Sequence, residues 1–86
     1  MKIRISKHAR EQAAARYISL DLIRIVSKSP QQIVTSEEEG TVCQSRIFDY
    51  DMKKEMLFRV VVSDVGPIRS VVTAYKTSKI AKYWSE

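Results

Sequence analysis

The sequence predicts an α+β domain in which helices pack on a mostly antiparallel sheet. One observation is an alanine-rich segment, residues 7–16, whose composition strongly favours a helix. The other is the series of apolar, strand-like segments after residue 31, which are joined by short turns. Strands connected by short turns pair antiparallel. The 86 residues leave room for one domain, spanning 1–86, with one modest core.

The first third of the chain is expected to form a short strand and two helices. Residues 2–5 alternate polar and apolar side chains, which indicates a strand. Ser6 is a suitable N-cap for a helix over 7–16, and Ser19 begins a second helix that Pro30 ends. The helix faces rich in alanine or in branched apolar residues are expected to cover the sheet.

The rest of the chain is expected to supply the sheet. Strands are predicted at residues 32–35, 41–50, 56–62 and 68–75, and a short helix is predicted from residue 77 or 78. The element order is therefore β-α-α-β-β-β-β-α, with about four to five strands in one sheet. The residues expected to face the helices are Met56, Phe58, Val60, Val62, Ile68, Val72 and Ala74.

The net charge of +5 is unevenly distributed. Residues 1–16 carry five bases and one acid, and residues 68–86 carry four bases and one acid. If the two ends meet in the fold, they form one basic patch that attracts a polyanion or an acidic protein. The alternative is an ordinary solvated surface that keeps the protein soluble.

Several kinds of chemistry lack support in the sequence. No spacing of metal ligands, glycine-rich phosphate loop or nucleophile motif occurs, so neither a metal nor a cofactor is expected. The single cysteine, Cys43, excludes an internal disulfide and suits a reducing, cytoplasmic compartment. Cys43 is expected in the core. Glu37, Glu38 and Glu39 are expected in a solvated loop, or alternatively to shield the basic patch of the chain ends or to meet a basic partner.

Each long strand carries an arginine in its interior, and these residues are Arg46, Arg59 and Arg69. Alternation along the last two strands places Arg59 and Arg69 on an exposed polar face, together with Thr73 and Tyr75. Arginine holds phosphate oxygens well, and tyrosine or histidine can transfer a proton, so this face suits phosphodiester chemistry. The alternative is ordinary pairing of exposed residues across strands.

His8 is the only imidazole of the chain and lies at the start of the first predicted helix. Its cationic neighbours Lys7 and Arg10 favour a neutral imidazole, which can act as a base. The alternative is a plain surface residue.

Several short motifs together resemble a known family. They are residues 6–10 at the first helix start, Arg16 before the isoleucine that opens the second helix, the proline that ends it, and the segments 57–62 and 71–80. With them the chain resembles a family of small bacterial domains of unknown function that is related to the RelE/ParE toxins. The resemblance implies two helices on an antiparallel sheet. It also implies metal-independent cleavage of RNA through attack by the 2′-hydroxyl, which leaves a cyclic phosphate.

The resemblance also assigns roles to residues. It implies His8, Arg59 and Tyr75 as catalytic groups, and Lys79 and Lys82 in place of the catalytic lysines of RelE itself. Together with the strand residues above, the substrate-binding set becomes Arg16, Arg46, Arg69, Thr73, Lys79 and Lys82. The partners considered are a cognate antitoxin protein, RNA or the ribosome, and a second copy in a homodimer, but no membrane.

Two functions remain open from the sequence. One is a toxin-like endoribonuclease. The other is a non-catalytic binding module, because ParE-type relatives inhibit a topoisomerase and cleave no RNA, and a shared fold does not fix a function. A plain nucleic-acid-binding domain is less favoured, since no aromatic pair has the spacing of an RNA-recognition motif.

Overall fold

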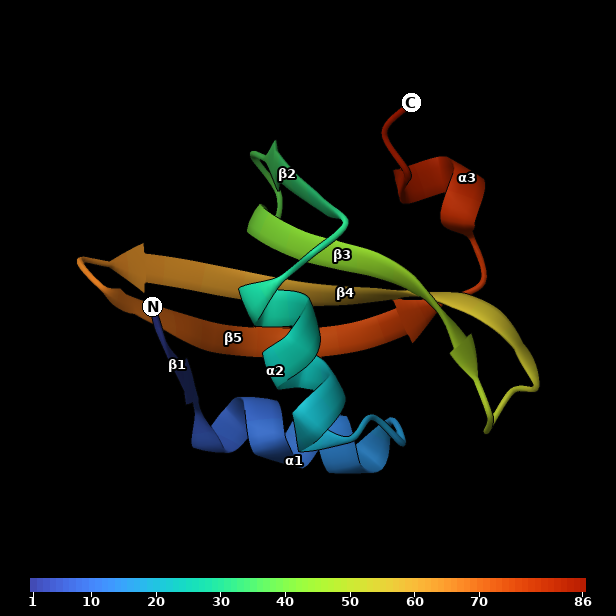
Figure 1. Cartoon of the computed structure of the whole chain (residues 1–86), viewed down its shortest axis with the longest axis horizontal. Coiled ribbons are helices and arrows are strands. Elements are labelled where there is room, and N and C mark those ends of the chain that lie inside the picture. Colours follow the sequence, from blue (N-terminus) through green and yellow to red (C-terminus); the bar gives the residue numbers. More distant parts are fainter.

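The computed structural model describes residues 1–86 and shows an α+β fold built on one five-stranded mixed sheet (Figure 1). The element order is the predicted one, and most boundaries lie within a few residues of those expected. The elements are β1 (Lys2–Ile5), α1 (Lys7–Ala15), α2 (Leu20–Lys28), β2 (Gln32–Ser36), β3 (Gly40–Asp49), β4 (Lys54–Val65), β5 (Ile68–Thr77) and α3 (Ile80–Tyr83).

The sheet has the strand order β1-β5-β4-β3-β2. Strands β2 to β5 form an antiparallel meander, whereas β1 pairs parallel to β5, with Lys2 opposite Ile68. The parallel pair is possible because α1, α2 and the meander together form the long connection that parallel strands need. The two longer helices thus follow β1 and do not precede the whole sheet, and the third helix is C-terminal.

Serine caps define where the two longer helices begin. Ser6 Oγ accepts a hydrogen bond from the amide of Ala9 at 3.0 Å, and Ser19 Oγ accepts one from the amide of Leu22 at 3.1 Å. These bonds satisfy amides that have no partner within a helix. Helix α1 ends with the Ile18 amide donating to the Ala13 carbonyl at 2.9 Å, in a turn that places Tyr17 at a φ of 56°.

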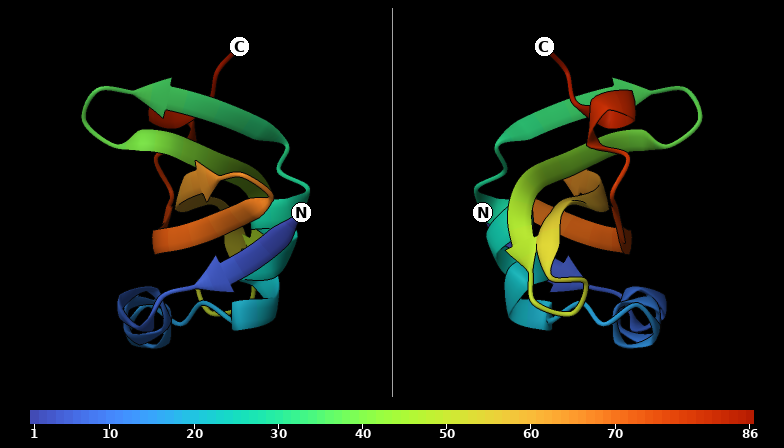
Figure 2. Two further views of the ribbon diagram at one scale, coloured as in Figure 1. Left: turned by 90° about the vertical axis from the view of Figure 1, so that its left-hand side faces the viewer. Right: turned by 90° about the vertical axis from the view of Figure 1, so that its right-hand side faces the viewer.

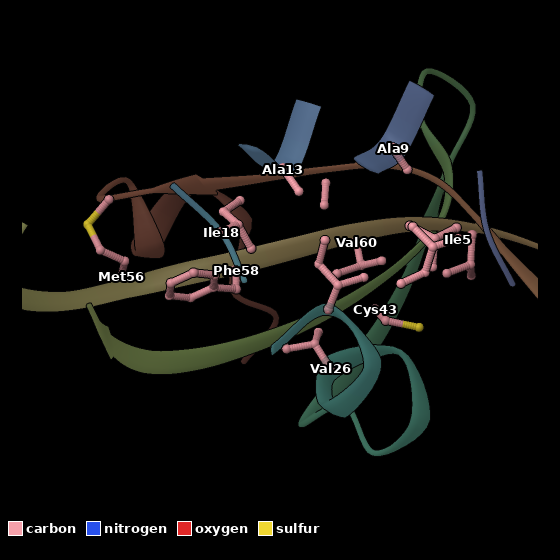
Figure 3. Close-up of a cluster of buried hydrophobic side chains, with 13 residues drawn as sticks. Ile5, Ala9, Ala13, Ile18, Val26, Cys43, Met56, Phe58 and Val60 are labelled. Carbon is pink, nitrogen blue, oxygen red and sulfur yellow. The ribbon is translucent and has the colours of Figure 1, made fainter. Parts of the chain in front are cut away.

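The core lies between the sheet and helices α1 and α2 (Figure 3). Ala9 and Ala13 are buried, and their small side chains let α1 pack closely on β5. Phe58 and Val60 belong to the same buried cluster as Val26 of α2, as predicted. The full cluster is Ile5, Ala9, Ala13, Ile18, Ile23, Val26, Cys43, Met56, Phe58, Val60, Val62, Val71 and Ala74.

A β-bulge at Val72 changes which residues of β5 face the core. Val61 pairs with Thr73, but Val62 pairs with Val71, so Val72 has no partner on β4. Val71 is therefore fully buried and Val72 is 46% exposed. The prediction that Val72 faces the helices is wrong, because uninterrupted alternation cannot anticipate a bulge.

The opposite face of the sheet is also covered. Figure 2 shows the β2–β3 hairpin and α3 on one side of β4 and β5, with α1 and α2 on the other. Leu57 and Gln44, which point to this second side, are both fully buried. The expected open polar face is thus the interior of a second, smaller layer. None of the three helices is long and apolar enough to cross a bilayer.

A buried ion pair fastens the far end of β5 to the β3–β4 hairpin. The ammonium of Lys76 lies 2.7 Å from the carboxylate of Asp49 and 3.3 Å from that of Asp51. The side chains of Lys76 and Asp49 are 9% and 8% exposed. Hydrogen bonds to the two aspartates outweigh the effect of burial and raise the pKa of Lys76.

Candidate functional site

Arg59 and Tyr75 lie directly opposite each other on the neighbouring strands β4 and β5. Arg59 Nη1 donates a hydrogen bond to the hydroxyl of Tyr75, and the guanidinium carbon lies 5.6 Å from the centroid of the tyrosine ring. Both side chains point to the face away from α1 and α2. Two of the three residues expected to be catalytic are therefore in contact.

Glu39 joins this pair from the turn between β2 and β3. Arg59 Nη1 donates to Glu39 Oε1 at 2.6 Å, and the Tyr75 hydroxyl donates to Glu39 Oε2 at 2.7 Å. The turn is held by Ser36 Oγ, which accepts from the Glu39 amide at 3.0 Å, and by Gly40 at a φ of 81°. The expectation of a solvated loop is therefore wrong for Glu39, which shields a basic side chain instead.

Gln44 and Tyr83 enclose the other sides of the guanidinium. Arg59 Nε donates to Gln44 Oε1 at 2.9 Å, while Gln44 Nε2 donates to the Tyr83 carbonyl at 3.0 Å. The Tyr83 ring, on α3, lies 4.2 Å from the guanidinium carbon, a distance at which a cation and an aromatic ring attract. We call these five residues the Arg59 cluster: Glu39, Gln44, Arg59, Tyr75 and Tyr83.

Arg59 is only 3% exposed, so the expectation of an exposed strand arginine is wrong. The alternation of β4 placed Arg59 on the correct face, but α3 and the β2–β3 hairpin cover that face. A buried charge is costly unless it is paired and hydrogen-bonded, which explains why an acid, an amide and a phenol surround this guanidinium.

The charges of the cluster at neutral pH follow from its contacts. Burial, together with the hydrogen bond to Glu39, raises the pKa of Tyr75 to about 12, so the phenol is neutral. Burial also acts to raise the pKa of Glu39, but the hydrogen bonds from Tyr75 and Arg59 outweigh it and lower that pKa. The cluster thus holds a carboxylate, a neutral phenol and a cation in mutual contact.

His8 and Arg46 lie outside the cluster. His8 is exposed at the start of α1, on the opposite side of the sheet, so it does not converge with Arg59 and Tyr75. Arg46 lies on the face of Arg59 but is exposed, pairs with Glu55 at 2.7 Å, and stacks 5.3 Å from the Trp84 ring.

Arg69 is not on the face of Tyr75, and this expectation is wrong. The bulge at Val72 turns Arg69 to the helix side, where its side chain is almost buried. There it forms a two-pronged pair with Asp64, both contacts at 2.8 Å, and donates to the Ser27 carbonyl at 2.8 Å and to Cys43 Sγ at 3.3 Å. Arg69 therefore ties the end of α2 to the sheet. Cys43 is a buried core residue, as predicted.

Arg16 and Tyr75 line one open pocket of about 470 Å³, together with Met52, Met56 and Lys76. Arg16 follows the last residue of α1, and its Nη1 donates to the Ala74 carbonyl at 2.8 Å. It thereby satisfies a backbone acceptor on the part of β5 that β1 does not reach. The pocket lies on the side of the sheet that carries α1, whereas the Tyr75 hydroxyl lies with Arg59 on the other side.

The remaining predicted residues lie around the cluster without direct contact to Arg59. Thr73 is two residues before Tyr75 on the same strand and is half-buried. Lys79 precedes α3 and is exposed. Lys82, on α3, is exposed and stacks 5.1 Å from the Tyr83 ring, and its charge helps to lower the pKa of Glu39.

Sequence reasoning missed Glu39, Gln44 and Tyr83. A usable signal was present, because an arginine in the middle of an apolar strand requires an acid nearby once the strand is buried. Glu39 directly precedes Gly40, whose left-handed conformation reverses the chain into β3. Nowhere do three His, Cys, Asp or Glu side chains gather in an arrangement that could hold a metal ion.

Comparison of the chain with known protein families, with curated proteins and with solved structures finds no match. The contacts within the Arg59 cluster are therefore the basis for a function.

Proposed function

We propose that this chain is a metal-independent endoribonuclease of the RelE type, with Arg59, Tyr75 and Glu39 as its reacting groups. The observation that carries the proposal is that a guanidinium, a neutral phenol and a carboxylate contact one another on one sheet face. These are the three kinds of group that transesterification of RNA needs: a cation for the phosphate, an acid and a base.

In the proposed reaction, Glu39 accepts the proton of the RNA 2′-hydroxyl while the 2′-oxygen forms a bond to the adjacent phosphorus. The bond from phosphorus to the 5′-oxygen breaks, and Tyr75 donates its proton to that oxygen. The products are a cyclic phosphate and a free 5′-hydroxyl. Arg59 stabilises the negative charge that accumulates on the phosphate oxygens. Glu39 thereby takes the role expected of His8, which lies on the other side of the sheet.

This mechanism requires the cluster to open, because the Tyr83 ring covers the guanidinium in the structure. Helix α3 has only four residues and includes no buried residue. The polar contacts of α3 and the residues after it to the sheet are the Gln44 bond to the Tyr83 carbonyl and the bonds between Gln32 and Ser85. Few polar contacts therefore hold α3 over Arg59.

The second candidate is a non-catalytic binding module of the RelE/ParE type. The observation that favours it is that Arg59 is buried and already paired by Glu39, Gln44 and Tyr75. Under this alternative the cluster only joins the hairpin and α3 to the sheet. An antitoxin protein, the ribosome and a second copy of the chain remain parts of the proposal that come from the resemblance. A cytoplasmic location is proposed from the single cysteine, Cys43.

The test is to incubate the purified protein with RNA in EDTA and to analyse the products for a cyclic phosphate. Tyr75→Phe and Glu39→Gln should each lower the rate about 10²–10⁴-fold, as expected for loss of a general acid or base. Tyr50→Phe is the matched control, because Tyr50 is 84% exposed and makes no contact with the cluster. Tyr83→Ala should raise the rate, since it uncovers Arg59.

Two results would decide against the nuclease. One is cleavage that requires a divalent metal. The other is cleavage that is unchanged in Tyr75→Phe. If free RNA is not cut, the protein is expressed in cells: growth arrest that Tyr75→Phe relieves supports a nuclease acting on ribosome-bound RNA, whereas unrelieved arrest or normal growth supports the binding module.

A further inference from the structure

The whole net charge of the protein resides in its first 28 residues. This segment, which forms β1, α1 and α2, contains seven bases and two acids, giving +5. Residues 29–86 contain eight bases and eight acids, giving zero. The charge that the sequence showed at the C-terminal end is thus balanced by the acids of the sheet.

The bases of the two segments also differ in their partners. Of the eight bases in residues 29–86, four form a salt bridge with an acid, namely Arg46, Arg59, Arg69 and Lys76, and the other four form none. All seven bases of the first segment are exposed, and none of them is in a salt bridge: Lys2, Arg4, Lys7, Arg10, Arg16, Arg24 and Lys28. Their charges are therefore free to attract an anion.

Five of these bases lie on or next to the edge of the sheet formed by β1, with Lys2 and Arg4 on the face opposite to the buried Ile5. Lys2 and Arg4 are on β1, and Lys7 and Arg10 follow within the first turn of α1. Lys28, at the end of α2, lies nearby because Arg69, opposite Ile3 in the sheet, donates to the carbonyl of the neighbouring Ser27. We call the set Lys2, Arg4, Lys7, Arg10 and Lys28 the basic edge.

The C-terminal bases do not join the basic edge. Lys82 belongs to α3 and Lys79 directly precedes it, and α3 lies on the other side of the sheet from α1 (Figure 2). The expectation that both ends of the chain form one basic patch is therefore wrong. The basic edge is also separate from the Arg59 cluster, so a ligand held there does not occupy the proposed reaction site.

We propose that the basic edge binds the phosphodiester backbone of a nucleic-acid duplex. Free, exposed lysine and arginine side chains that follow a strand and a helix start are suited to a regular row of phosphates. The positive end of the α1 dipole adds to the same potential. This function is independent of RNA cleavage and does not require the proposed nuclease to be correct.

The basic edge has no exposed aromatic residue, which favours a nucleic-acid duplex over single-stranded nucleic acid and over a protein partner. The exposed aromatic side chains Tyr17, Phe48 and Tyr50 lie at the α1–α2 turn and the β3–β4 hairpin, away from the basic edge. Single-stranded nucleic acid is held largely by stacking on aromatic rings, and the hot spots of protein interfaces are enriched in Trp and Tyr as well as Arg. A duplex backbone needs no aromatic ring.

The experiment measures binding of short fluorescent RNA and DNA duplexes over a range of salt concentrations, with Tyr75→Phe as the background so that cleavage does not interfere. The Lys2→Gln/Lys7→Gln double variant should weaken binding and reduce the slope of log K against log salt by about 2. The Lys53→Gln/Lys54→Gln variant is the matched control. It loses the same charge from exposed lysines of the β3–β4 turn and β4, and should bind as the parent does.

Equal weakening by both double variants would overturn the proposal, because it would show attraction by net charge alone. So would the absence of binding to either duplex at low salt, or competition by polyglutamate as effective as by unlabelled duplex, which would point to an acidic protein. Comparison of the affinities for the RNA and the DNA duplex shows which of the two the basic edge binds.

Discussion

Arg59 and Tyr75 face each other across two strands and bind the same carboxylate, that of Glu39. The ladder already pairs β4 with β5 at these two residues, and Glu39 joins the β2–β3 turn to both strands. The cluster therefore contributes to folding whether or not it performs chemistry, and this contribution can be measured.

Glu39→Gln should lower the free energy of unfolding at neutral pH by about 1–3 kcal/mol, because charge-assisted hydrogen bonds to a buried guanidinium are lost. The pKa of Glu39 is lowered in the folded state. Its contribution is therefore fully present above the ordinary pKa of 4.5 and is lost as the pH falls through the folded-state value. Urea titrations of the parent and variant should converge in acid. Glu38→Gln is the control, and an equal pH effect there would contradict the assignment.

Phe58→Ala should cost about 3–5 kcal/mol, since the ring is buried between the sheet and α2. A loss of this size can unfold a domain whose total stability is of the same order. Phe48→Ala is the matched control, because that ring is 50% exposed. Thermal melts give the comparison. Similar melting temperatures for the two variants would show that the core is placed on the wrong side of β4.

Lys76→Met should destabilise the protein by about 3–5 kcal/mol, because it leaves the buried Asp49 carboxylate without its cation. Adding Asp49→Leu to this variant should restore much of the stability, since replacing a buried ion pair by apolar groups is often neutral. Denaturant unfolding of the single and double variants tests this. A double variant less stable than Lys76→Met would mean that Asp49 has another structural role.

Tyr17→Gly should raise stability by up to about 1 kcal/mol. Tyr17 occupies a left-handed conformation at the end of α1, a position where glycine avoids the clash of a Cβ atom. Its side chain is 75% exposed, so little burial is lost. Tyr17→Ala retains the Cβ atom and should give no such gain. Equal stabilisation by both substitutions would exclude relief of backbone strain as the cause.

The local features of the fold were predictable because local chemistry determines them. Ser6 and Ser19 correctly predict where the first two helices begin, and the alternation of β4 correctly places Phe58 and Val60 in the core. The parallel pairing of β1 was not foreseen, because short turns say nothing about which strand the first segment joins.

The predictions that are wrong concern features that depend on tertiary structure. The bulge at Val72 exchanges the faces of β5, so Arg69 lies on the side opposite to that expected. The burial of Arg59 depends on α3 and the β2–β3 hairpin returning over the sheet, which no periodicity in β4 encodes. Arg59 and Glu39 are 20 residues apart in the sequence. Their contact could be predicted only if the position of the β2–β3 hairpin over the sheet were known.

The pairing of β1 with β5 has a consequence for how the chain folds during synthesis. Lys2 finds its partner Ile68 only after 66 further residues have been made, which takes roughly 3–13 s at typical elongation rates of about 5–20 residues per second. During that interval the apolar sides of β1, α1 and α2 have no β5 to cover them. Folding of this domain is therefore delayed until β5 has been made, and the nascent segment of residues 1–28 is the part of the domain most in need of protection from aggregation.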